Sequence, residues 1–77
     1  MMVSEGIKTI MEQKQLSLRG VANRLDCSTQ NVYQTLLRDK WNLNQLIKYA
    51  NVLDYDVEIV LKDRKSNERI VCDANRE

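Results

Sequence analysis

The side chains best suited to specific hydrogen bonding lie in one short stretch, Ser28 to Gln34, which reads STQNVYQ. Hydroxyls and amides dominate this stretch, and it contains no carboxylate. A side-chain amide donates and accepts at once, which suits it to the edge of a purine base. We therefore treat the stretch as a candidate binding site. The competing interpretation is a helix cap with ordinary polar exposure.

The remaining composition gives little support for catalysis. The chain has no His, which removes the commonest general base and the commonest metal ligand. Cys27 and Cys72 form no CxxC pair, so zinc is not expected, and the lack of a secretory signal argues against a disulfide between them. We interpret both as small core or boundary residues. Gly6 and Gly20 form no phosphate-binding loop, so we expect no enzyme, no cofactor and no metal site.

Length and charge indicate one small domain over residues 1–77. The chain is 43% hydrophobic and 30% charged, which is typical of a globular protein. We find no signal peptide and no transmembrane segment, and so expect a cytoplasmic protein with no membrane partner. Residues 1–50 carry seven basic and four acidic side chains, whereas residues 51–77 carry five basic and seven acidic ones. This asymmetry is compatible with a polyanion partner on one side and equally with an ordinary hydrated surface.

Apolar spacing predicts a mainly α fold, with four helices within about residues 4–53 and a C-terminal β-hairpin over about 57–73. Ser4, Ser17 and Asn42 are expected N-caps, and Ser28 or Thr29 caps the third helix. With no Pro in the chain, we assign the turns to Gly, Asn and Asp, including a positive φ at Asn67. The expected elements are helices over 4–14, 18–25, 29–37 and 43–53 and strands over 57–62 and 69–72.

The second and third helices fit a helix-turn-helix motif. Ala22 is small enough to let the helices approach closely, and Val32, ten positions later, can lock them together. Asp26 lies in the turn, where a residue that tolerates positive φ is needed. If Val32 and Leu36 point inward, about 100° per residue places Gln30, Tyr33, Gln34 and Leu37 outward.

This outward face predicts contact with DNA. The N-terminal half of such a helix enters the major groove, and Thr29 and Asn31 lie at that end. Free N–H groups at the same end, around Ser28, suit a phosphate. Basic side chains flank the segment and are placed to contact the DNA backbone. The flanking residues are Arg19, Arg38 and Lys40.

The segment SLRGVANRLDCSTQNVYQTLLRDK, followed by NLNQLIKYANVLDYDVEIVLKD, resembles the Cro/C1-type (XRE-family) helix-turn-helix repressors of bacteria and their phages. The resemblance covers about residues 4–62. It implies a bundle of four or five helices, operator binding and transcriptional control. Two departures are Leu18, where an amide is common in the family, and a hairpin where many members continue with a fifth helix. The resemblance implies base contacts by Thr29, Gln30, Asn31 and Gln34 and backbone contacts by Ser17, Arg19, Arg38 and Lys40.

The hairpin predicts a homodimer, because a lone two-stranded hairpin is marginal in water and pairing of its edge with a second copy would extend the sheet. We expect Val57, Ile59 and Leu61 to face the helices. A two-fold dimer would place two recognition helices about 34 Å apart on double-stranded DNA. The alternatives are a monomer whose hairpin caps the core, and a protein-interaction module or antitoxin that acts through the hairpin. The expected interface residues are Val57, Ile59, Val60, Ile70 and Val71.

Overall fold

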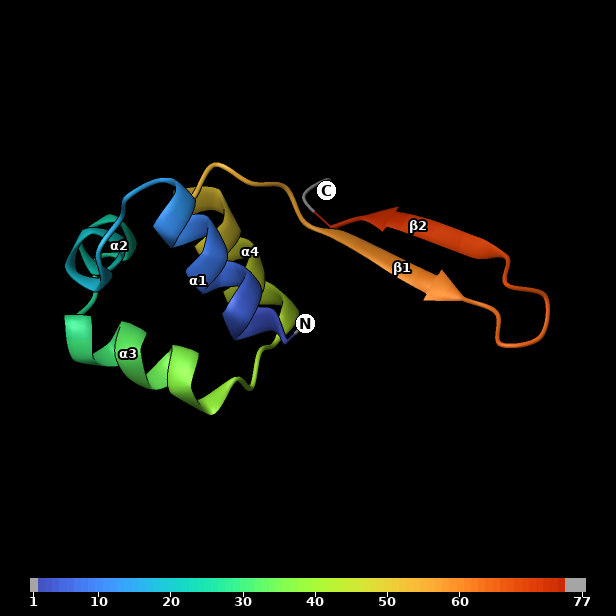
Figure 1. Cartoon of the computed structure of the whole chain (residues 1–77), viewed down its shortest axis with the longest axis horizontal. Coiled ribbons are helices and arrows are strands. Elements are labelled where there is room, and N and C mark those ends of the chain that lie inside the picture. Colours follow the sequence, from blue (N-terminus) through green and yellow to red (C-terminus); the bar gives the residue numbers. More distant parts are fainter. Residues whose placement is uncertain (1, 75–77) are drawn as a thin grey trace.

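In the computed structural model, which describes residues 2–74, four helices precede one two-stranded antiparallel sheet (Figure 1). The helices form a body, and the hairpin projects from it as an arm, so that the molecule extends 43 × 25 × 22 Å. The predicted order of helices and strands is confirmed, and each bound agrees with the prediction to within one residue. The elements are α1 Val3–Gln13, α2 Leu18–Leu25, α3 Thr29–Arg38, α4 Leu43–Val52, β1 Glu58–Lys62 and β2 Arg69–Asp73.

The core lies between the four helices and is built from their apolar faces. Val21 and Ala22 of α2 pack against Val32 and Leu36 of α3, and all four are buried. The exposed fractions of Ala22 and Val32 are 1% and 0%, and α2 packs against α3, so the prediction that both residues lie in the core of the two helices is confirmed. Burial of each Val or Leu side chain stabilises the fold by roughly 1.5–3 kcal/mol. The other members of the core are Ile7, Met11, Tyr49 and Leu53.

Residues with left-handed backbone end α2 and α3, and neither of them is glycine. Asp26 ends α2 at φ 58°, and Asp39 ends α3 at φ 52°. Asn67 in the hairpin loop has φ 63°, as predicted. Asp and Asn tolerate this region better than other side chains do. The expectation that glycine would also serve in turns is wrong: no glycine has positive φ, and Gly20 lies inside α2.

The first helix begins differently from the prediction. Ser4 was expected to be the N-cap, but α1 starts at Val3, its N-cap is Met2, and no side chain caps it. The Ser4 amide instead donates to Oδ1 of Asp39, at 2.8 Å, and Ser4 is buried. A carboxylate 35 positions away therefore satisfies a free N–H of the first turn, which removes the need for a local cap.

The hairpin pairs β1 with β2 so that Val60 lies opposite Val71 and Leu61 opposite Ile70. Asp63 Oδ1 accepts from the amides of Lys65 and Ser66 and shapes the loop, and these hydrogen bonds lower the pKa of Asp63. The prediction that the apolar face of β1 covers the helices holds only at its base.

Val57 is buried and Ile59 half-buried, but Leu61 is 58% exposed, because the strands lead away from the helical body (Figure 1). Cys72 is exposed as well, which corrects its interpretation as a core or boundary residue. Cys27 is half-buried, and both cysteines are free thiols.

Candidate functional site

In the α2–turn–α3 unit a serine caps the start of each helix, and a tight turn joins the two helices. Ser17 Oγ accepts from the Gly20 amide, and Ser28 Oγ accepts from the Asn31 amide, each at 3.0 Å. Between the helices, the Cys27 amide donates to the Ala22 carbonyl at 3.0 Å, across left-handed Asp26. The serine caps predicted for α2 and α3 are thus confirmed. This arrangement fixes the direction in which α3 leaves the turn.

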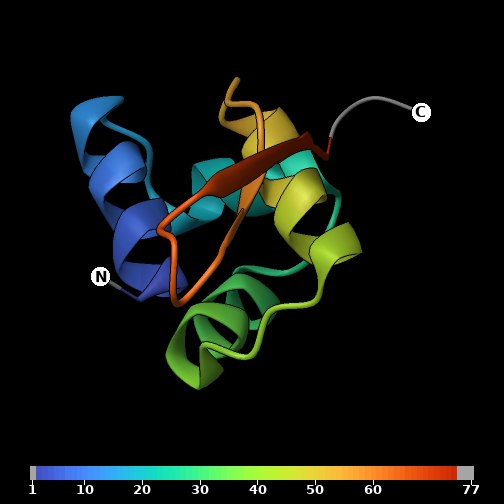
Figure 2. The ribbon, with the colours of Figure 1, turned by 90° about the vertical axis from the view of Figure 1, so that its right-hand side faces the viewer.

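One side of α3 faces away from the body and carries most of the predicted base contacts. In Figures 1 and 2, α3 lies at the outer edge of the helical body. Thr29, Gln30 and Tyr33 are exposed, whereas Gln34 is half-buried at the rim of the core. Leu37, one turn beyond Tyr33, is 62% exposed. From Ser28 to Arg38 the chain has no carboxylate, so this side offers donors and acceptors without negative charge.

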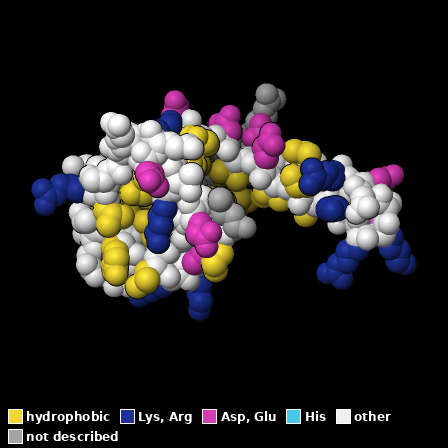
Figure 3. Space-filling view, viewed as in Figure 1, with side chains coloured by type: hydrophobic (Ala, Val, Ile, Leu, Met, Phe, Trp, Pro, Cys, Tyr) yellow, Lys and Arg dark blue, Asp and Glu magenta, His cyan; other side chains and the backbone are white. Residues whose placement is uncertain are grey.

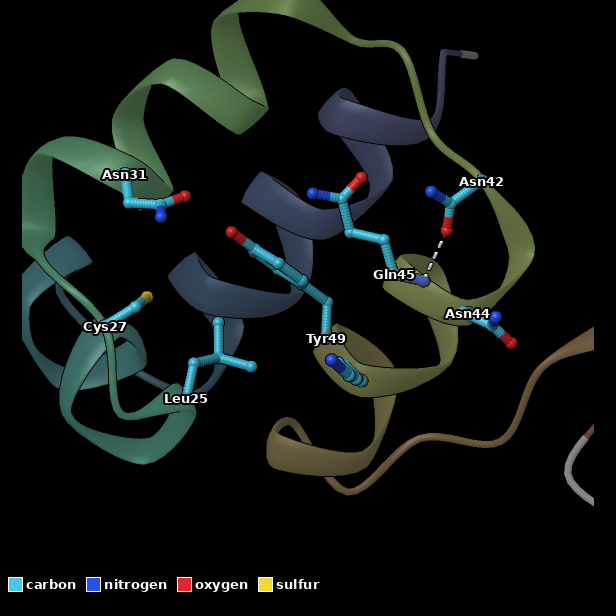
Figure 4. Close-up of a pocket in the computed structure, with 8 residues that line it drawn as sticks. Leu25, Cys27, Asn31, Asn42, Asn44, Gln45 and Tyr49 are labelled. Atoms are coloured by element: carbon cyan, nitrogen blue, oxygen red, sulfur yellow. Dashed lines mark hydrogen bonds between the residues drawn. The ribbon is translucent and has the colours of Figure 1, made fainter.

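Asn31 lies apart from the other predicted base contacts. It is exposed, but its Oδ1 accepts from Thr35 Oγ1 at 3.4 Å, and it lines an open pocket of ≈ 370 Å³ between α3 and α4 (Figure 4). The ring of Tyr49, on α4, extends across the pocket toward Asn31 and Cys27. Sequence reasoning did not find this pocket. Its other lining residues are Leu25, Cys27, Asn42, Asn44, Gln45, Lys48 and Tyr49.

The pocket is polar at its α4 side. Asn42 Oδ1 accepts from the Gln45 amide at 2.8 Å and caps α4, as the sequence predicted. Asn44 and Lys48 are exposed on the same helix. Tyr49 is buried, and this burial raises the pKa of its phenol above the ordinary value. The pocket therefore offers neutral donors and one lysine beside the N-terminal half of α3.

The predicted backbone-contacting side chains are exposed and available. Within residues 2–74, Arg19, Arg38 and Lys40 donate no hydrogen bond to the protein. Ser17 and Ser28 are exposed, and each cap uses the hydroxyl oxygen only as an acceptor, which leaves its O–H free to donate to an anion. The five residues thus supply donors at the start of α2 and at both ends of α3.

Two other basic side chains of the helical body have structural roles. Arg24 donates from its guanidinium to the Val52 carbonyl at 2.9 Å. Lys14 Nζ donates to the Leu53 carbonyl and lies 5.0 Å from the centre of the Tyr55 ring. Positive groups are favourable at the C-terminal end of a helix, here that of α4. Two of the seven basic side chains in residues 1–50 therefore bind the protein's own backbone, and the charge excess of this part overstates what is available to an external partner.

A brace between α1 and the segment after α3 fixes the C-terminal end of α3. Asp39 Oδ1 accepts from the Ser4 amide and from the Trp41 indole, and the indole also lies 3.1 Å from Ser4 Oγ. Hydrogen bonding by Ser4 and Trp41, together with the charge of Lys8, lowers the pKa of Asp39 below its ordinary value. The Trp41 ring packs edge-on against Tyr49, with ring centres 4.8 Å apart.

Sequence reasoning missed this brace, because its partners are far apart in the chain. The brace restricts the positions of Arg38 and Lys40, because they flank Asp39, which is hydrogen-bonded to Ser4.

In the part of the chain that the structure describes, no three His, Cys, Asp or Glu side chains group closely enough to hold a metal ion. No helix in residues 2–74 has the length and apolar character needed to cross a membrane. Comparisons with protein-family models, with curated proteins and with solved structures gave no match to the chain.

Proposed function

We propose that this chain is a sequence-specific DNA-binding transcriptional regulator, a repressor of the Cro/C1 type, which acts in a bacterial cytoplasm and inserts α3 into the major groove. The observation that carries the proposal is the exposed side of α3. It is uncharged and bears amides and hydroxyls, and its helix is locked to α2 by Val32 against Ala22. A helix-turn-helix unit reads DNA with such a face.

Each exposed side chain has a role in this proposal. Gln30 pairs with an adenine edge, because a side-chain amide matches the N6 donor and N7 acceptor. Half-buried Gln34 reaches the groove with its terminal amide, and Thr29 contacts an adjacent base. Tyr33 and Leu37 supply apolar contact, for which the thymine methyl is the matching group. Asn31, turned toward the pocket, reads a base at the edge of the site.

The contacts to the DNA backbone come from the groups that the protein leaves unused. The hydroxyls of Ser17 and Ser28 donate to phosphate oxygens, and Arg19, Arg38 and Lys40 neutralise charge. These contacts set the position of α3 but carry no sequence information. A homodimer formed through the hairpins would place two copies of α3 on successive turns of a near-palindromic site.

Selection from a pool of random duplexes tests the proposal. We expect the wild-type protein to retain duplex DNA at low ionic strength and to enrich one short sequence or an inverted repeat. Gln30→Ala should change or abolish the enrichment. The matched control is Gln13→Ala, which removes an exposed amide from the end of α1 and should leave the enriched sequence unchanged. Failure to retain any duplex would exclude the proposed function.

A second candidate function is a protein-interaction module, such as an antitoxin whose hairpin binds a partner. The exposure of Leu61 and Ile70, at 58% and 65%, favours a protein partner for the arm. The two functions use different surfaces and can coexist. Substitution of Leu61 by Ser would impair the protein partner's binding and spare DNA retention, whereas Gln30→Ala would do the opposite.

A further inference from the structure

The hairpin carries a charge pattern on one of its two faces. Residues that lie directly opposite in an antiparallel pair project to the same side, and successive residues along a strand alternate. The register therefore places three cross-strand pairs on one face, which we call the Val60 face. In order from the base to the tip of the arm, the pairs are Glu58 with Asp73, Val60 with Val71, and Lys62 with Arg69.

Two of these pairs bring like charges together. The acidic pair lies at the base and the basic pair at the tip, and like charges directly opposite destabilise a two-stranded sheet. All four charged side chains are exposed. Figure 3 shows acidic side chains near the base of the arm, apolar ones along it, and basic ones gathered toward its tip. The Lys62–Arg69 pair at the tip is therefore an unfavourable contact within the arm, and acidic side chains of a partner would relieve it.

The centre of the same face is apolar and uncovered. Val60 and Val71 are 44% and 58% exposed, although β-branched side chains of this kind favour a packed surface. Val57, which we expected at the dimer interface, is buried within its own chain and so lies outside this surface. A partner must thus match an apolar centre flanked by an acidic end and a basic end.

We propose that the Val60 face binds the Val60 face of a second copy, with the two arms antiparallel and the two-fold axis passing beside Val60 and Val71. A two-fold axis at the centre brings the base of one arm to the tip of the other. The acidic pair of each copy then meets the basic pair of its partner, while the valines pack across the axis. The face is complementary to itself in this orientation only, because parallel arms would oppose like charges.

The pairing of the arms rests on the proposed function in one respect, which is that binding to two half-sites on DNA requires a dimer. Because dimerisation is measured in the absence of DNA, the arm pairing and the DNA binding can be refuted separately. A monomer that still enriches a half-site would overturn the arm pairing alone. A dimer that retains no duplex would overturn the DNA reading alone.

The test is charge reversal in the full chain, followed by sedimentation. Lys62→Glu with Arg69→Glu makes the Val60 face wholly acidic, and Glu58→Lys with Asp73→Lys makes it wholly basic. Each double variant keeps like charges opposite one another in both outer pairs of the Val60 face, as in the wild type. We expect each variant alone to dimerise about tenfold or more weakly than the wild type, and an equimolar mixture to form a heterodimer.

The matched control is the double variant Glu5→Lys with Glu12→Lys, whose substitutions lie on α1. It changes the net charge by the same amount as the basic variant, and we expect it to dimerise like the wild type. Far-UV circular dichroism reports whether each variant keeps its helices. A wild-type protein that remains a 9.0 kDa species throughout the micromolar range would overturn the inference. Folded double variants that fail to associate on mixing would also overturn it.

Single reversals separate face packing from pairing of strand edges. An antiparallel β1–β1 edge contact centred on Val60 would oppose Glu58 and Lys62 but leave Arg69 at a distance. Packing through the Val60 face makes Lys62→Glu and Arg69→Glu weaken dimerisation alike. An effect of Lys62→Glu alone would overturn the face assignment.

Discussion

Truncation of Val32 should show how strongly the helix-turn-helix unit depends on one contact. Val32 of α3 is fully buried in the core that also contains Ala22 of α2, so Val32→Ala removes two buried methyl groups. Their transfer to water costs about 1.6 kcal/mol at about 0.8 kcal/mol per carbon, and the cavity adds about 1 kcal/mol. We therefore expect the free energy of unfolding to fall by about 2–3 kcal/mol.

A loss of this size is large for a chain of 77 residues, since folded proteins are stable by roughly 0.05–0.15 kcal/mol per residue. Urea unfolding followed by far-UV circular dichroism measures it as a shift of the midpoint at constant slope. The control is Leu37→Ala, which removes a larger side chain from the exposed side of the same helix and should cost less than about 0.5 kcal/mol. Equal losses for the two variants would refute the assignment of Val32 as the lock between α2 and α3.

Three further predictions concern charge, turn geometry and acidity. Arg38→Ala should weaken binding to all duplexes alike and lower the slope of log K against log salt by about one; a loss confined to one sequence would contradict its assignment to the backbone. Asp26→Gly should raise the free energy of unfolding by about 1 kcal/mol, because glycine occupies φ 58° without strain; a lower urea midpoint would contradict this. The pKa of Asp39 in the folded protein is lowered from its ordinary value of 3.8, so its ionised carboxylate stabilises the fold at pH values above 3.8. This stabilisation is lost as the pH falls through the pKa of the folded state. The difference in unfolding free energy between the wild type and Asp39→Asn should shift in favour of the variant on acidification over that range, and a difference independent of pH would contradict the role of the charge.

The sequence was sufficient to predict the features that depend on interactions between neighbouring residues, namely the helices, the strands and the N-caps. Periodicity located all six elements, and capping chemistry identified Ser17, Ser28 and Asn42, because each cap hydrogen-bonds an amide three residues later. The left-handed turn at Asp26 followed from the need to reverse the chain between two closely packed helices. These features depend on neighbours in the sequence and so are visible in it.

The features that were missed depend on partners far along the chain. Ser4 fits a local cap as well as Ser17 does, but Asp39 satisfies its amide across 35 positions. The alternation of β1 predicts a strand with an apolar face. It does not tell whether that face contacts the helices, and the exposure of Leu61 shows that the outer end of the face does not. Similarly, the rotation that turns Asn31 toward α4 depends on how α3 packs, which spacing alone does not fix.

Whether the exposed amides of α3 read bases can be measured as the loss of binding free energy that Gln30→Ala causes on two duplexes. Fluorescence anisotropy at one salt concentration gives the dissociation constants for the duplex selected by the wild type and for a random duplex of equal length. If Gln30 reads a base, we expect a loss of about 1–3 kcal/mol on the selected duplex and almost none on the random one. Equal losses on both, or no loss on either, would contradict it.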